Sequence, residues 1–143
     1  MTNKSKKRKA GDANLASEFY VASQLYRLGY TVTITLGHTK EIDLVVVHPN
    51  GKTITVDVKG LKNTTNWPLT PKLKSKDHFY ILINYKNKFG DLFFLPEVFV
   101  IPSLEIDNLL SSWAGKPNVK CVGYRDIKNS KYKDAWELLF KQE

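Results

Sequence analysis

The chain has 143 residues, of which 42% are hydrophobic and 12% aromatic, enough to bury the core of one folded domain. No stretch approaches the roughly 20 apolar residues that cross a membrane, and the single cysteine, Cys121, cannot form an internal disulfide, so neither a membrane protein nor a secreted one is expected. The net charge of +8 favours a polyanionic partner. We expect a cytoplasmic protein that contacts nucleic acid and no membrane.

Basic residues crowd the beginning of the chain. They are Lys4, Lys6, Lys7, Arg8 and Lys9. A block of like charges is typical of disorder, so residues 1–10 are predicted to form a disordered basic tail, followed by a single domain over residues 11–143. The tail would assist nucleic-acid binding through salt-sensitive phosphate contacts that carry no sequence information. A solvated tail without a partner is the alternative.

The first predicted helix covers residues 13–28, with Asp12 as its N-cap and Gly29 as its C-terminal stop. Apolar residues at three- and four-residue steps predict its buried face. They are Leu15, Phe19, Ala22, Leu25 and Leu28. Glu18 lies at the edge of this stripe, where its carboxylate either borders the core or reaches water. Residues 30–36 then alternate between polar and apolar and predict a strand.

Two β-rich runs, residues 42–47 and 53–58, flank the turn cluster Pro49-Asn50-Gly51, a pattern that predicts an antiparallel hairpin. If the loop is centred on Asn50, residues equidistant from it pair, which places Asp43 opposite Asp57. The Cβ atoms of such a cross-strand pair lie roughly 5 Å apart. Two carboxylates would then share one site.

The alternation of side chains along the hairpin separates a core face from a polar face. The core face carries Ile42, Leu44, Val46, Ile54, Val56 and Val58. The polar face carries Asp43, Asp57 and Lys59, and directly opposed like charges call for a positive partner. Lys59 is one candidate and a hard divalent cation, Mg²⁺ or Mn²⁺, is the other. The alternative is a solvated sheet face with an ordinary ion pair, and a slip of one residue would turn Asp43 away.

Residues 60–77 are polar and basic, and Trp67-Pro68 and Pro71 discourage a long helix there. The lysines that we assign to phosphate contact include Lys40, in the turn before the hairpin. The others are Lys62, Lys72, Lys74 and Lys76. Trp67 could stack on a base, but packing against the core is the interpretation that we favour.

The second half of the chain predicts strands over residues 79–85 and 92–101, which extend the same sheet. Helices are predicted from Ser103 to Trp113 and over residues 131–140, with a short strand over 119–124 between them. The histidines lack ligand-like spacing and are expected as surface or strand residues. They are His38, His48 and His78. The predicted fold class is α/β, with a central mixed sheet of about five strands, an N-terminal helix and C-terminal helices.

A set of residues in the first 60 positions follows a known motif pattern. It consists of Gly11, Glu18, Leu25-x-x-Leu28-Gly29-Tyr30, Gly37, Ile42-Asp43-Leu44 and Val56-Asp57-Val58-Lys59-Gly60. With these residues the chain resembles the PD-(D/E)XK nuclease superfamily, which has the restriction-endonuclease-like three-layer fold. The resemblance is strongest to its Holliday-junction-resolvase and Mrr-like branch.

The resemblance implies a metal-dependent endonuclease that hydrolyses phosphodiester bonds in DNA, with duplex and branched substrates both open. It implies that Asp43 bridges Mg²⁺ or Mn²⁺, that Asp57 is a second ligand and that Glu18 is an accessory ligand through water. Lys59 would orient or activate the attacking water. A homodimer is expected by the same analogy, because two strands must be cut. The alternative is a catalytically silent nucleic-acid-binding or accessory protein that retains the fold.

Overall fold

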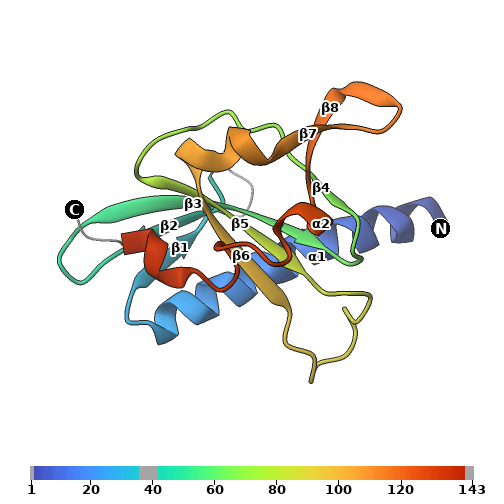
Figure 1. The fold of residues 1–143 in the computed structure, drawn as a ribbon. Helices are drawn as coiled ribbons and strands as arrows, with labels where there is room; N and C mark the ends of the chain where they lie inside the picture. The colour runs from blue at the N-terminus through green and yellow to red at the C-terminus, as the bar shows by residue number, and fades with distance from the viewer. Residues whose placement is uncertain (1, 36–41, 141–143) are drawn as a thin grey trace.

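The computed structural model describes residues 2–35 and 42–140, with the backbone alone over residues 2–10 (Figure 1). Its centre is a five-stranded sheet in the order β1-β2-β3-β5-β6. The strands are β1 (Thr31–Ile34), β2 (Leu44–Val47), β3 (Thr53–Leu61), β5 (His78–Asn84) and β6 (Glu97–Pro102). β3 and β5 run parallel and the other neighbours antiparallel, so the predicted mixed α/β sheet is confirmed.

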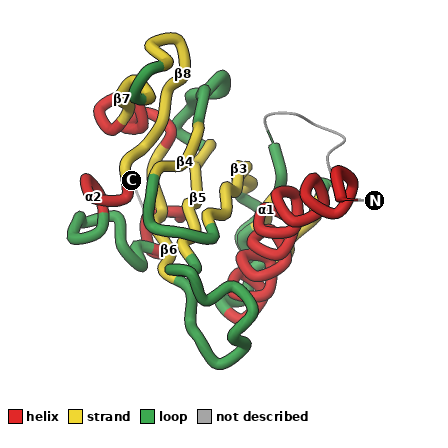
Figure 2. Tube along the Cα trace, turned by 90° about the vertical axis from the view of Figure 1, so that its right-hand side faces the viewer, coloured by secondary structure: helices red, strands yellow, loops and turns green. Residues whose placement is uncertain are grey.

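Helix α1 (Thr2–Arg27) covers one face of this sheet (Figure 2). It begins ahead of the expected start at Asp12, so residues 2–10, expected as a disordered tail, are helical here. Lysine, arginine and alanine have good helix propensity, and a single internal glycine costs only about 1 kcal/mol. No helix in the described part of the chain is long and apolar enough to span a bilayer.

The buried stripe of α1 differs from the predicted one. Small residues at four-residue steps, Ala13, Ser17 and Val21, lie against the sheet together with Leu25. Of the predicted stripe, only Ala22 and Leu25 are buried, whereas three larger side chains are about half exposed. They are Leu15, Phe19 and Leu28. The small side chains face the sheet because they let the helix backbone approach β3 closely.

A second sheet covers the opposite face, in the order β4-β8-β7. Its strands are β4 (Asn66–Pro68), β7 (Leu110–Trp113) and β8 (Lys116–Gly123). Parallel strands are usually joined by a helical crossover. The described chain between β3 and β5 contains β4 instead and no helix. The absence of a helix after Lys59 agrees with the prolines there.

The helix predicted from Ser103 to Trp113 is wrong in its second half. A 3-10 helix, η1 (Ser103–Leu109), is followed by β7, which pairs with β8 across a turn at Gly115 with φ 77°. The backbone hydrogen bonds of this hairpin outweigh the helical periodicity of the apolar residues. Two short helices complete the structure, α2 (Tyr124–Ile127) and the 3-10 helix η2 (Trp136–Phe140).

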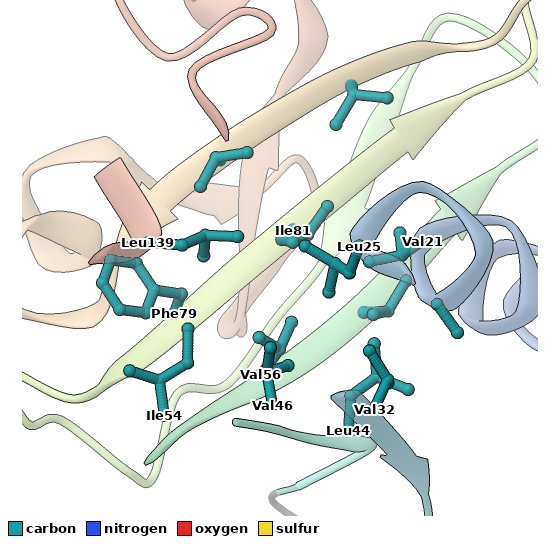
Figure 3. Close-up of a cluster of buried hydrophobic side chains, with 14 of the residues drawn as sticks. Val21, Leu25, Val32, Leu44, Val46, Ile54, Val56, Phe79, Ile81 and Leu139 are labelled. Atoms are coloured by element: carbon teal, nitrogen blue, oxygen red, sulfur yellow. The ribbon is translucent and has the colours of Figure 1, made fainter. Parts of the chain in front are cut away.

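The last helix, η2, begins at Trp136 and is shorter than the predicted span of 131–140. The segment before it bonds to the edge of β6 instead: Val100 donates to the Tyr132 carbonyl at 2.9 Å and Asp134 to the Val98 carbonyl at 2.8 Å. Two apolar cores result, one on each face of the central sheet. Figure 3 shows the first core, in which Val21 and Leu25 pack over the sheet and Leu139 closes the far end.

Candidate functional site

The hairpin has the predicted register. Leu44 pairs with Val56 and Val46 with Ile54, both equidistant from Asn50. The Asp43 amide continues this ladder by donating to the Val56 carbonyl at 2.9 Å. β2 begins only after Asp43, whereas β3 runs on to Leu61, so no strand of the described residues lies beside the last part of β3 on that edge.

Side chains satisfy this free edge of β3. The Val58 amide donates to Asp43 Oδ2 at 2.7 Å, and the Gly60 amide donates to Asn14 Oδ1 at 2.8 Å. The first bond draws the Asp43 carboxylate across the end of β2 towards β3. The second bond joins the strand to α1. The position of Asp43 is thus fixed by a backbone donor as well as by the hairpin.

Close packing of α1 on β3 requires a glycine at position 60. A Cβ there would lie 2.4 Å from the Ala13 carbonyl oxygen and 2.3 Å from Ser17 Oγ. Ser17 in turn donates to the Ala13 carbonyl and shares a 3.0 Å hydrogen bond with the Tyr85 hydroxyl. This contact brings the partly buried Glu18, the next residue of the helix, to the end of the hairpin.

Asp57 is the buried member of the acidic pair, with 7% of its surface exposed. Lys59 Nζ lies 3.7 Å from Asp57 Oδ1, which is an ion pair but too long for a hydrogen bond, and this oxygen has no hydrogen-bond partner among the described residues. Burial and the neighbouring Asp43 carboxyl raise the pKa of Asp57 from 3.8 to about 8, although Lys59 opposes the rise. Asp57 therefore keeps its proton near neutral pH in the metal-free protein.

Glu18 belongs to the same electrostatic cluster. Burial and the negative charge of Asp43 raise its pKa to about 7, and the positive charge of Lys59 opposes the shift. The structure thus brings together the acids at 18, 43 and 57 with the amine of Lys59. Within residues 2–35 and 42–140, however, no three His, Cys, Asp or Glu side chains converge closely enough to hold one ion.

The carboxylates of the site are oxygen ligands, the type that a hard cation prefers. Mg²⁺ is typically held by one or two carboxylates together with water and substrate phosphate, so a complete protein cage is not required. Asp43 and Asp57 supply oxygen ligands, and the buried Asp57 Oδ1, which accepts no hydrogen bond from the described residues, is an atom that a cation would satisfy. These two carboxylates fit Mg²⁺ or Mn²⁺.

One buried histidine near the site was not singled out by sequence reasoning. His78 lies at the start of β5 and shares a 2.7 Å hydrogen bond with Thr55 Oγ1, while its Nε2 has no partner in the described chain. Burial lowers its pKa to about 4, against the opposing charge of Asp43, so the ring is neutral at pH 7. Its place in a strand agrees with the prediction. Only the parallel pairing of β3 with β5 reveals its neighbour Thr55.

The predicted phosphate-binding lysines that the structure describes differ in their surroundings. Lys62 lies over the Phe89 ring at 4.7 Å, and Lys74 bonds to Asp107. Lys72 and Lys76 are exposed in the segment that leads to β5. Lys40 and the side chains of Lys6, Lys7, Arg8 and Lys9 lie outside the described part of the structure. Trp67 is fully buried, as predicted, and its indole donates to the Ile83 carbonyl at 3.1 Å.

Comparisons with known proteins do not add to this picture. No family model, curated protein or solved structure matches the chain. Site residues can therefore be assigned only from the chain's own geometry, in which Asp43, Asp57 and Lys59 meet at the open end of the hairpin.

Proposed function

We propose that this protein is a metal-dependent endonuclease that hydrolyses phosphodiester bonds in DNA, with a restriction-endonuclease-like fold of the PD-(D/E)XK type. One observation carries the proposal. The carboxylate of Asp57 is buried next to that of Asp43, and the amine of Lys59 lies 3.7 Å from Asp57 Oδ1. A buried carboxylate beside a second acid is costly unless a cation or a proton relieves it.

The element order supports the same proposal. A helix with a partly buried glutamate precedes a hairpin whose second strand carries the Asp-x-Lys pattern, and the polar residues lie where the two strands of the hairpin part. Folds of this type often have a helix in the connection from β3 to β5. Here the connection contains β4 of the second sheet, which departs from that pattern. The second sheet covers the face opposite α1.

Each residue has a distinct task in the proposed reaction. Asp43 and Asp57 would hold the cation, which supplies a more acidic water and positive charge next to the phosphate. Lys59, about one third exposed, would orient the attacking water and offset the charge that develops on the phosphate oxygens. Glu18 would hold a proton or a water at the edge of the site, because its pKa of about 7 allows both charge states.

A second candidate is a nucleic-acid-binding protein that keeps the fold without turnover. The observation that favours it is that the described residues offer no three-ligand cluster. All four polar groups that the proposed reaction uses are present, at positions 18, 43, 57 and 59, which favours the enzyme.

Cleavage assays separate these two functions. Plasmid and branched DNA are incubated with the protein in Mg²⁺ or Mn²⁺ and in EDTA, together with Lys59→Ala and with Lys120→Ala, which changes an exposed lysine on β8. We expect cleavage that requires metal, is lost in Lys59→Ala and persists in Lys120→Ala. Cleavage that survives both EDTA and Lys59→Ala would reveal contamination, and binding without cleavage would favour the second candidate.

A further inference from the structure

The loop between β5 and β6, residues 85–96, projects from the body of the molecule in both views (Figures 1 and 2). Its tip carries the most exposed large apolar side chains that the structure describes. Leu92 is 93% exposed, Phe93 is 100% exposed and Leu95 is 73% exposed. Scattered exposed apolar residues are ordinary, but three within four positions on a projecting tip indicate a contact surface.

Hydrogen bonds and ring contacts define the shape of this loop. Asn84 Oδ1 accepts from the Lys86 amide at 2.7 Å, and Asp91 Oδ1 accepts from the Phe93 amide at 3.0 Å. Phe89 packs edge-on against Tyr85 with 4.8 Å between ring centroids. The loop thus turns some of its aromatic residues inward and holds Phe93 outward.

The loop is attached to the candidate site through the end of β3. The Tyr85 amide donates to the Leu61 carbonyl at 2.9 Å and the Asn87 amide to the Lys62 carbonyl at 2.6 Å. Leu61 and Lys62 follow Lys59 within three residues of chain. The apolar tip therefore emerges from the same end of the sheet as the site.

The charges around the tip are mainly positive. Lys86 and Lys88 precede it in sequence and Lys62 lies against Phe89, whereas the acidic residues nearest in sequence are Asp91 before the tip and Glu97 after it. Lys88 also lies over Phe94, 5.2 Å from the ring centroid. An apolar tip among cations suits a partner that combines anionic groups with apolar ring faces, which are the phosphates and bases of nucleic acid.

We propose that Leu92 and Phe93 form a wedge that stacks on or between the bases of DNA whose backbone lies at the Asp43–Asp57–Lys59 site. This inference rests on the proposed function for its choice of DNA. Inserting an apolar side chain requires bases to unstack, at a cost of about a few kcal/mol per step in intact duplex. The wedge therefore selects branched or single-stranded DNA, whose bases are already partly unstacked, over continuous duplex.

Binding measured without cleavage tests the wedge. The parent is full-length Lys59→Ala in Mg²⁺, and fluorescence anisotropy reports its affinity for branched, single-stranded and duplex DNA. Phe93→Ala and Leu92→Ser are added to this parent. The matched control is Leu104→Ala, which removes a 62% exposed leucine at the opposite end of β6. A 2-aminopurine at the branch reports unstacking.

Loss of one stacked base corresponds to about 1–3 kcal/mol, so Phe93→Ala should weaken binding to branched and single-stranded DNA about 5- to 150-fold. The 2-aminopurine signal of the parent should be lost with it, whereas Leu104→Ala should match the parent. Equal affinities of Phe93→Ala and the parent would overturn the proposal. So would an absence of DNA binding by the parent, or Phe93-dependent binding to anionic vesicles in place of DNA.

These results are independent of whether the protein cleaves DNA. If Phe93 contributes to binding but the native protein cleaves no DNA, the wedge stands and the hydrolytic function fails. If the native protein cleaves DNA and Phe93→Ala binds as the parent does, the hydrolytic function stands and the wedge fails.

Discussion

Replacing Asp57 by asparagine should stabilise the metal-free protein at alkaline pH. The folded protein holds a proton on Asp57 up to a pKa of about 8, whereas the unfolded chain releases it near 3.8. Between these values the folded state binds more protons, so the free energy of unfolding falls as pH rises. This contribution is fully present below pH 3.8 and is lost through pH 8.

The expected size of the effect follows from the same two values. Each tenfold change in proton affinity is worth about 1.4 kcal/mol, which gives an upper bound on the order of 5 kcal/mol. Water entry and relaxation around the carboxyl pair reduce this cost. Between pH 3.8 and 8 we therefore expect the free energy of unfolding of the wild type to fall by about 2–4 kcal/mol relative to that of Asp57→Asn. Burial of the uncharged amide avoids the loss.

Urea unfolding in EDTA at several pH values between 6.5 and 8.5 follows the last part of this fall, in which the wild type should lose about 1–2 kcal/mol relative to Asp57→Asn. The window excludes His78, whose pKa of about 4 makes stability rise with pH between 4 and 6.5. Asp12→Asn, which changes an exposed carboxylate on α1, is the control and should follow the wild type. If Asp57→Asn shows the same pH dependence as the wild type, Asp57 is not a proton-holding group and the reasoning fails.

Three further predictions concern packing, metal and assembly. Gly60→Ala should lower the free energy of unfolding, measured in urea, by about 1–3 kcal/mol, because the added Cβ meets the Ala13 backbone. Gly90→Ala is the control and should leave it unchanged, because no described atom lies within 4 Å of its Cβ. Equal losses in the two variants would refute the packing argument. At pH 8, Mg²⁺ should raise the melting temperature of the wild type but not of Asp43→Asn; a rise in both would place the ion elsewhere. Gel filtration with light scattering should show a homodimer on DNA, and a monomer at micromolar concentration would contradict it.

The hairpin was predictable because its turn and the alternation of apolar and polar side chains along its strands imply the same register. A turn at Pro49-Asn50-Gly51 sets which residues pair, and the β-branched residues on either side match only one register. The positions of Asp43, Asp57 and Lys59 follow from that register and from the two-residue period of a strand. This is why the acidic pair could be anticipated without a structure.

Other features depend on contacts between distant segments. Both faces of α1 carry apolar residues, so periodicity alone favoured Leu15 and Phe19 over the small residues that pack on Gly60. The second sheet joins β4 to β8, whose residues are more than 50 positions apart, and the pattern of the 103–113 segment fits a helix as well as a strand. His78 meets Thr55 only through parallel pairing.

The way in which the end of β3 is covered has a consequence for solubility. An unpaired strand edge is a template for adding a strand from another molecule, which is a route to aggregation. Asp43 and Asn14 occupy the two donors, at Val58 and Gly60, that an incoming strand would need. The Asp43 carboxylate, which we propose as a metal ligand, thus also prevents edge-to-edge association. Substitutions of Asp43 are therefore expected to increase aggregation.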